Sequence, residues 1–217
     1  MSEPKVVMIT GSNSSLGRCF IRMYAEEYKI IGVSRTTPAI RDDTYHFIKA
    51  NVNHPEIMEE VIAVHGTVDV LINNAVFRDH VPLIRKTSKN FRKEVRTGLV
   101  TPLMLSNTLI ESVWGKDGKS ENKLRNRSIV NISSIAGVNV YGPRGLGTYS
   151  AYKAGLNMLT RHMALEYFDE YGIRVNAVAP NTFPNIVSTE SVCSGIRTLI
   201  EGESNGLIAV LDKSVNR

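Results

Sequence analysis

The sequence predicts an α/β protein in which about seven parallel strands form one doubly wound sheet with helices on both faces. Short apolar runs rich in β-branched residues alternate with longer stretches of helical period, the pattern of repeated strand–helix–strand units. The chain has 217 residues, of which 42% are hydrophobic, and this is enough for one domain with a full core. We therefore expect residues 1–217 to fold as a single domain.

The predicted strands are apolar and nearly free of charge, as expected where helices cover both faces of a parallel sheet. They are Val6–Ile9, Ile30–Val33, His46–Ile48, Val68–Ile72, Ser128–Ile132, Arg174–Ala179 and Leu207–Leu211. The predicted helices are Leu16–Tyr28, Pro55–His65, Asn90–Val113, Thr148–Tyr171 and Glu190–Glu201. Because Gly115–Asn126 is polar, we expect a surface loop there. An apolar stripe in the longest helix fits either core packing or contact with a second subunit, and consists of Leu156, Leu159 and Met163.

Composition limits the functional classes. The formal net charge is +5, but the basic clusters Arg85–Arg96 and Lys116–Arg127 lack aromatic residues at base-stacking spacing, which disfavours nucleic-acid binding. The apolar run near the N-terminus is too short for a leader or a membrane span, and no other stretch reaches membrane length. The two cysteines and five histidines fit no metal-ligand spacing. We expect a soluble, cytoplasmic protein with no metal and a small-molecule partner.

A turn of small residues follows the first predicted strand, in the order Thr10-Gly11-Ser12-Asn13-Ser14-Ser15-Leu16-Gly17. Such a turn before a helix gathers free backbone N–H groups and the positive helix end, which suits a pyrophosphate. Gly11 permits the turn, and Gly17 lets the helix pack closely on the strand. The same residues fit an ordinary helix start capped by Ser or Asn. Their place after the first strand of an alternating chain favours a dinucleotide site of the Rossmann type.

The second predicted strand ends in Ser34 and Arg35, where a Rossmann unit faces the adenosine ribose. A carboxylate at this place binds the ribose of NAD and repels the 2′-phosphate of NADP. This chain has a hydroxyl and a guanidinium instead, which suit a phosphate dianion. The pattern favours NADP(H) over NAD(H), although a plain loop arginine also fits it.

Tyr149 and Lys153 are four residues apart at the start of the longest predicted helix, so they share one helix face. An ammonium beside a phenol favours the phenolate and lowers its pKa, so that the tyrosine can exchange a proton with a carbonyl or alcohol. The same spacing occurs where the two side chains only pack on a helix surface. Tyr152 is the weaker candidate because its helical neighbours, Thr148 and Leu156, cannot tune a phenol.

With these residues in view, the chain resembles the short-chain dehydrogenase/reductase family over essentially its whole length. The matching segments occur in the family's order: Thr10-Gly11…Gly17, Asn73-Asn74-Ala75, Ile132-Ser133-Ser134, Tyr149…Lys153, Arg174-Val175-Asn176-Ala177-Val178-Ala179-Pro180, and a last strand within 205–212. Each motif alone is of limited specificity, and their common order makes the resemblance strong. The short segment between Pro180 and Gly206 is similar to the C-factor and sniffer-like carbonyl reductases.

The resemblance implies a Rossmann-type fold, a homodimer or homotetramer, and a catalytic set of Ser134, Tyr149 and Lys153. Lys153 would also bind the nicotinamide ribose. The implied cofactor-binding residues are Gly11, Ser12, Asn13, Ser14, Ser15, Leu16, Gly17, Ser34, Arg35, Asn51, Val52, Asn74, Ala75, Tyr149, Lys153, Pro180 and Thr182. The implied activity is NADPH-dependent hydride transfer to or from a carbonyl or alcohol.

Five positions depart from the family's pattern. Four lie in the implied cofactor groove, namely Ser15, Asn51, Val76 and Asn181. The fifth is Gly98, which stands where the family has an asparagine that supports a proton-relay water. These departures motivate an alternative hypothesis, a catalytically degenerate nucleotide-binding sensor or scaffold. An epimerase or dehydratase that uses the same tyrosine also stays open.

Overall fold

The computed structural model describes residues 3–38, 44–54, 56–140 and 144–212. Its strands are β1 (Val6–Thr10), β2 (Lys29–Ser34), β3 (His46–Lys49), β4 (Val70–Asn73), β5 (Ser128–Ile132), β6 (Arg174–Pro180) and β7 (Ile208–Leu211). Its α-helices are α1 (Ser15–Tyr24), α2 (Glu56–His65), α3 (Ser88–Val95), α4 (Thr101–Leu109), α5 (Gly115–Leu124), α6 (Gly147–Tyr171) and α7 (Thr189–Glu201). Short helical segments are η1 (Leu83–Arg85), η2 (Arg96–Val100), η3 (Ile110–Trp114) and η4 (Ile135–Gly137).

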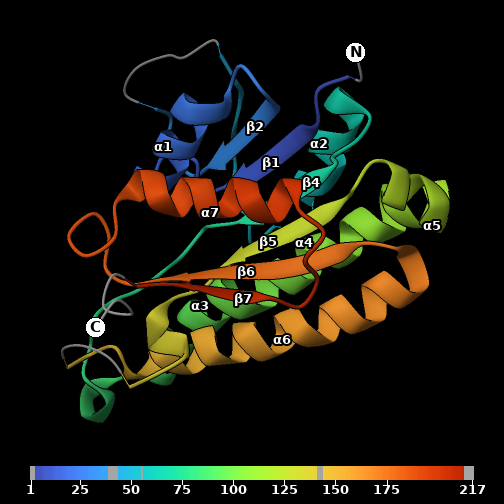
Figure 1. The fold of residues 1–217 in the computed structure, drawn as a ribbon. Helices are drawn as coiled ribbons and strands as arrows, with labels where there is room; N and C mark the ends of the chain where they lie inside the picture. The colour runs from blue at the N-terminus through green and yellow to red at the C-terminus, as the bar shows by residue number, and fades with distance from the viewer. Residues whose placement is uncertain (1–2, 39–43, 55, 141–143, 213–217) are drawn as a thin grey trace.

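The seven strands form one parallel sheet in the order β3-β2-β1-β4-β5-β6-β7. The chain builds outward from β1 to β3, returns to β4 beside β1, and then builds outward in the other direction. The strand order therefore reverses between β1 and β4, and a crevice opens outside the carboxyl ends of strands at such a point. In Figure 1 the strands point toward the left, so that this edge of the sheet lies on the left side of the molecule.

Helices cover both faces of the sheet, as the alternation of buried strand residues requires. Val7 and Ile9 of β1 pack in a core with α1 and α7, whereas Val6 and Met8 pack in the opposite core with α2, α4 and α6. Successive side chains of a strand point to opposite faces, so each buried strand supplies both cores. In Figure 1, α7 lies across the front of the sheet next to α1, and the long helix α6 runs along its lower side.

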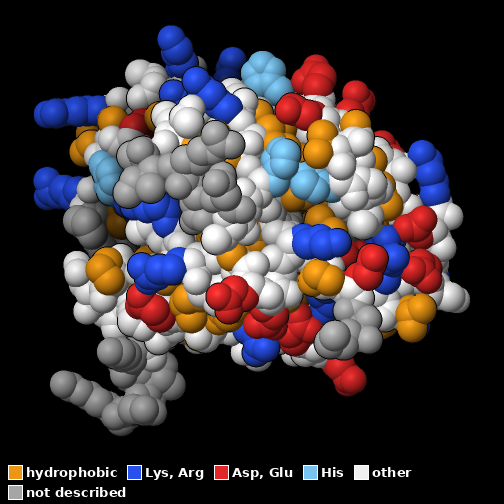
Figure 2. Space-filling view, turned by 90° about the horizontal axis from the view of Figure 1, so that it is seen from above, with side chains coloured by type: hydrophobic (Ala, Val, Ile, Leu, Met, Phe, Trp, Pro, Cys, Tyr) orange, Lys and Arg blue, Asp and Glu red, His pale blue; other side chains and the backbone are white. Residues whose placement is uncertain are grey.

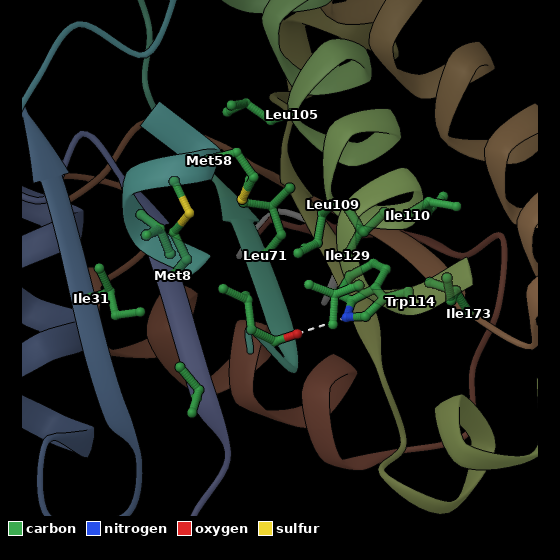
Figure 3. Packing of buried hydrophobic residues seen from close by; sticks show 14 of the residues in the cluster. Met8, Ile31, Met58, Leu71, Leu105, Leu109, Ile110, Trp114, Ile129 and Ile173 are labelled. Carbon is green, nitrogen blue, oxygen red and sulfur yellow. Dashed lines mark hydrogen bonds between the residues drawn. The ribbon is translucent and has the colours of Figure 1, made fainter. Parts of the chain in front are cut away.

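Trp114 closes the core of α2, α4 and α6 at the amino end of the sheet. Its side chain is fully buried, and its indole N–H donates to the backbone oxygen of Val68 at 2.7 Å. Figure 3 shows this bond and the ring of Trp114 against Leu109, Ile129 and Ile173. A buried indole N–H needs such a partner, and the bond ties the helical segment η3 to the strand that leads into the site.

The structure confirms the fold class and all seven strands, with small shifts of their ends. The prediction of a surface loop at Gly115–Asn126 was wrong, because the structure has helix α5 there. The helix forms because tertiary bonds replace local propensity: the buried amide of Asn122 donates to the backbone oxygens of Trp114 and Tyr171. Gly118, with a φ of 84°, breaks the helix near its start. The predicted helix position Pro55 lies outside the described residues.

Two further features of the helices bear on the sequence analysis. Leu156 and Met163 of α6 are 1% and 2% exposed, and Met163 and the neighbouring Leu159 pack in the core of the molecule. Of the two readings of this apolar stripe, core packing is therefore the one that the structure supports. Among the described residues, none of the helices combines the length and apolarity needed to cross a bilayer.

Candidate active site

A cavity of about 710 Å³ lies at the carboxyl edge of the sheet, at the point where the strand order reverses. Its walls come from the turns after β1, β2 and β4, from the segments after β3, β5 and β6, from α3 and η2, and from the start of α6. The predicted site residues on its wall are Gly11, Ser14, Ser15, Leu16, Ser34, Arg35, Asn51, Val52, Asn74, Ala75, Ser134, Tyr149, Pro180 and Thr182. Four predicted residues do not reach the wall, namely Ser12, Asn13, Gly17 and Lys153.

The turn after β1 depends on its two glycines. Gly11 has a φ of 69°, a conformation that other residues rarely adopt. At Gly17 an added Cβ would lie 2.6 Å from the backbone oxygen of Ser12, so only glycine allows α1 to start this close to the turn. Ser14 caps α1, its hydroxyl accepting from the N–H of Gly17 at 3.1 Å. The turn is thus both a capped helix start and a cradle that opens into the cavity.

Thr10 and Asn74 connect this turn to the end of β4. The hydroxyl of Thr10 accepts from the backbone N–H groups of Asn74 and Ala75, both at 3.0 Å. The side-chain amide of Asn74 donates to the backbone oxygen of Thr10 at 2.8 Å and to that of Gly11 at 3.1 Å. These bonds are buried or partly buried, and they hold the two sides of the crevice together.

The end of β2 forms another part of the wall. Ser34 and Arg35 both line the cavity, and Arg35 is exposed. Asn13 supports this loop, because its side-chain amide donates to the backbone oxygen of Thr36. Among the described residues that line the cavity, none is an aspartate or glutamate. Hydroxyls, a helix N-terminus and a guanidinium with no acid beside them fit a ligand that carries several negative charges.

Ser134 and Tyr149 lie together on the cavity wall, from the segment after β5 and the first turn of α6. Burial raises the pKa of the Tyr149 phenol, and this exceeds the lowering by its interaction with the Ser134 hydroxyl and by the charge of Arg78. This corrects the sequence expectation that an ammonium beside Tyr149 would lower its pKa. Tyr149 is therefore a neutral phenol at neutral pH, in the form that donates a proton.

Lys153 explains this correction. Its side chain is buried behind Tyr149, with 4% of the residue exposed, and its ammonium donates to the backbone oxygen of Ile132. The Nζ atom is 5.8 Å from the centre of the Tyr149 ring, so the two side chains are neighbours without a direct bond. Burial, and to a smaller extent the charge of Arg78, lowers the pKa of Lys153 to about 7. The sequence predicted the pair correctly as neighbours, but burial shifts both groups toward their neutral forms.

Tyr152 occupies the space that the missing side chain at Gly98 leaves. A Cβ at Gly98 would lie 2.3 Å from Cε2 and 2.6 Å from Cδ2 of the Tyr152 ring. The ring is 2% exposed and stands edge-on to that of Tyr149, with centroids 5.3 Å apart. Burial raises the pKa of Tyr152 far above the ordinary value, so its phenol stays neutral. Gly98 and Tyr152 are thus a complementary pair that packs the back of Tyr149.

Sequence reasoning missed several residues of the cavity wall beyond the family motifs. They are Phe77, Arg78, His80, Lys93, Thr97, Leu146 and Phe183. The most polar of them follow β4 or come from α3, and no local pattern distinguishes them from other surface residues.

Comparison with known proteins identifies the family to which this site geometry corresponds. A family model described as short chain dehydrogenase matches residues 5–192. An uncharacterized oxidoreductase of Schizosaccharomyces pombe is 33% identical over 185 residues, which cover 83% of this chain and 67% of that protein. The 3-oxoacyl-[acyl-carrier-protein] reductase of Vibrio cholerae is 31% identical over 190 residues, which cover 82% and 73% of the two chains. A short chain dehydrogenase of Leptospira borgpetersenii with bound NAD+ has the same fold, with a TM-score of 0.85, 22% identity and coverage of 97% and 92%.

The packing of Tyr152 on Gly98 generates a stability prediction. Gly98→Asn should destabilise the protein by about 3 kcal/mol, because an aromatic ring held between Tyr149 and the core cannot move away from the added side chain. Combining it with Tyr152→Ser should recover part of this loss, so that the double variant is more stable than the sum of the single changes predicts. Urea denaturation of the four proteins measures both quantities. Gly155→Asn is the control, since its added Cβ would lie no closer than 3.4 Å to Leu99; strictly additive effects would contradict the pairing.

The buried Lys153 generates a pH prediction. Between its folded pKa of about 7 and the unfolded value of about 10.4, the unfolded chain binds more protons than the folded one. The free energy of unfolding therefore gains a contribution that rises with pH across this window. Lys153→Met lacks this titration, so the stability of the parent minus that of Lys153→Met should increase from about pH 7 to about pH 10.

Urea denaturation across this pH range measures the difference, with the exposed Lys89→Met as the control for loss of one surface charge. Below neutral pH the Lys153→Met variant should be at least as stable as the parent, since it no longer buries a charge. A difference that stays constant or falls as the pH rises would show that Lys153 is not desolvated.

Proposed function

Because the chain belongs to the short chain dehydrogenase family, we propose that it transfers a hydride between NADP(H) and a small carbonyl or alcohol substrate. The observation that carries this proposal is the arrangement of Ser134 and Tyr149 on the wall of one cavity, with Lys153 directly behind them. The glycine turn and Arg35 line the same cavity. One hollow thus combines a proton donor with a cradle for a polyanionic cofactor.

The chain's residues fit a nicotinamide dinucleotide. The turn at Gly11 and the N-terminus of α1, with Ser14 and Ser15, would hold the pyrophosphate. Asn51 and Val52 would contact the adenine, and Asn74 with Ala75 would line the groove between the two halves. Pro180 and Thr182 would cover the nicotinamide end, where the bound cofactor supplies or accepts the hydride.

The protein's part in the chemistry is proton transfer and positioning. In the direction of reduction, the neutral Tyr149 hydroxyl gives its proton to the carbonyl oxygen, which the Ser134 hydroxyl holds in place. Lys153 is partly protonated at neutral pH, and a nearby anionic group favours its charged form. A charged Lys153 stabilises the phenolate that Tyr149 becomes, from its position behind the cavity wall.

Two observations support the finer parts of the proposal. Arg35 and Ser34, without an acid on the cavity wall, support NADP(H) over NAD(H). The Gly98–Tyr152 pair supports an enzyme over a degenerate scaffold, because the departure at Gly98 is filled by a side chain that packs against Tyr149. A carbonyl reductase and a cytoplasmic location remain proposals. A homodimer or homotetramer is also proposed, and the exposed apolar side chains of Met158 and Leu165 on α6 support it.

Tyr149→Phe tests the proposed proton donor. The variant should bind NADPH as the parent does but reduce carbonyl compounds at a rate lower by roughly 10²- to 10⁴-fold, the usual contribution of general acid catalysis. Absorbance assays of NADPH oxidation with a panel of aldehydes and ketones measure the rate, and fluorescence titration measures NADPH binding. Tyr171→Phe makes the same change at the far end of α6 and should retain activity. A Tyr149→Phe variant that turns over like the parent would remove Tyr149 from the mechanism.

Arg35→Gln tests the cofactor preference. The loss of charged hydrogen bonds to the 2′-phosphate should weaken NADPH binding by roughly 10- to 100-fold and leave NADH binding nearly unchanged. Calorimetric titration with both cofactors measures the ratio. Lys29→Gln, at the opposite end of β2, is the control for loss of one positive charge. An equal effect of Arg35→Gln on the two cofactors would contradict a role in recognising the 2′-phosphate.

A further inference from the structure

Among the residues that the structure describes, the charged side chains of the cavity wall are all cationic. Among the described residues they are Arg35, Arg78 and Lys93, to which His80 adds an imidazole. Figure 2 shows the same tendency on the surface: Lys and Arg side chains project along the left edge, toward which the strands of Figure 1 point, while most visible Asp and Glu side chains lie toward the right and bottom. Arg35 lies by the proposed 2′-phosphate, so the cations at the other end of the cavity need a separate explanation.

Arg78 lies at that other end, next to the proposed proton donor. Its guanidinium carbon is 5.1 Å from the centre of the Tyr149 ring. Within the described part of the chain, its side chain makes no ion pair or hydrogen bond with another residue. A guanidinium has five N–H donors in a planar fork that matches a carboxylate. Arg78 is exposed and lines the cavity, so its guanidinium can bind an anion beside the reaction centre.

The next residue along the chain is held by a buried ionic cluster. The carboxylate of Asp79 is paired with Lys86 and accepts from the side-chain amide of Asn90 at 2.7 Å. The ammonium of Lys86 also donates to Glu94 at 3.1 Å, and the side chains of Lys86 and Glu94 are 4% and 0% exposed. This cluster pairs the carboxylates of Asp79 and Glu94 with Lys86, and among the described residues none forms an ion pair with Arg78.

Glu94 also aligns Arg78 with Tyr149. One of its carboxylate oxygens accepts from the backbone N–H of Asp79 at 3.2 Å, and the other accepts from the hydroxyl of Thr148. Asp79 follows Arg78, and Thr148 precedes Tyr149. A single buried carboxylate thus binds the backbone next to Arg78 and the side chain next to Tyr149. These bonds keep the guanidinium and the phenol near each other.

The electrostatics favour an anion beside Arg78. Burial is the main cause that lowers the pKa of Lys153, and the charge of Arg78 adds to it; the same charge opposes the rise in the pKa of Tyr149. Arg78 and Lys153 are thus two cationic groups around one phenol. An anion bound at Arg78 relieves this repulsion.

We infer that the substrate is a short oxo acid or hydroxy acid whose carboxylate binds Arg78 while its carbonyl or hydroxyl oxygen lies at Tyr149. The inference rests on the proposed function and narrows its substrate class. Because the guanidinium faces the phenol ring, the carboxylate and the reacting oxygen belong to nearby carbons of the same small molecule. Arg78 is then a specificity-determining residue that touches substrate, and Glu94 is a positioning residue.

Matched pairs of substrates test the charge requirement. Each of 2-oxobutyrate and acetoacetate is compared with its own methyl ester, which keeps the carbonyl and removes the charge. The parent should favour the acids in kcat/KM, and Arg78→Gln should lower kcat/KM for the acids by roughly 10- to 100-fold with little change for the esters. Arg85→Gln is the control, because it removes the same charge from an exposed residue of the same segment that does not line the cavity. Equal use of acids and esters by the parent would overturn the inference, as would an equal loss on both in Arg78→Gln.

A binding experiment separates this inference from the proposed function. Calorimetric titration of the NADPH-saturated protein with oxamate, an unreactive oxo-acid analogue, should show binding that Arg78→Gln weakens and Arg85→Gln does not. NADPH affinity should be the same in all three proteins; a loss in Arg78→Gln would assign Arg78 to the cofactor and overturn the inference. Oxamate binding through Arg78 without turnover of any carbonyl would uphold the anion site and refute the proposed reaction. Turnover of neutral carbonyls without oxamate binding would do the reverse.

Discussion

The hydrogen bonds between Thr10 and Asn74 are the constraint on which the site depends. They cross from the end of β1 to the end of β4, the neighbouring strands between which the strand order reverses. Elsewhere along the carboxyl edge of the sheet, consecutive strands follow one another in the same direction, and the loops that connect them can cover the strand ends. At this point the loops diverge, and the Thr10–Asn74 bonds extend the pairing of β1 and β4 beyond the ends of the two strands. Asn74 also donates to the backbone oxygen of Gly11, and the segment that carries Arg78 continues from Asn74.

Behind the wall, burial controls the chemistry more than pairing does. Lys153 has no carboxylate partner among the described residues, and its ammonium is held by one backbone oxygen. Tyr149 and Tyr152 pack against each other at its side, and the absence of a side chain at Gly98 makes room for the second ring. Tyr149 is therefore supported by buried side chains. The burial of Lys153 lowers the stability of the folded protein, as is common where a residue serves function.

Much of the fold could be predicted from the sequence because buried parallel strands are short apolar runs and their order follows from the alternation with helices. Helix α5 could not be predicted, because its polar residues have no helical pattern and it is held by bonds from Asn122 to the backbone of Trp114 and Tyr171. The neighbours Tyr149 and Lys153 follow from helical spacing alone. Their pKa shifts do not, since desolvation depends on which segments cover them. Arg78 went unnoticed for a similar reason: in sequence it is followed by Asp79, and only the structure shows that Lys86 has taken that carboxylate.

The pairing of Asp79 and Glu94 with Lys86 determines the charge of the described cavity wall. Asp79 and Glu94 are close to the reaction centre in space, and either carboxylate, if free, would neutralise Arg78 and repel an anionic ligand. The buried Lys86 binds both and turns them inward, so that the charges that remain on the wall are positive. A buried ionic cluster of this kind adds little net stability, because desolvation offsets most of the attraction. Its value lies in the arrangement it enforces. The cluster holds Arg78 and the start of α6 in register, and it keeps the anion-binding end of the cavity distinct from the end where Arg35 faces the cofactor.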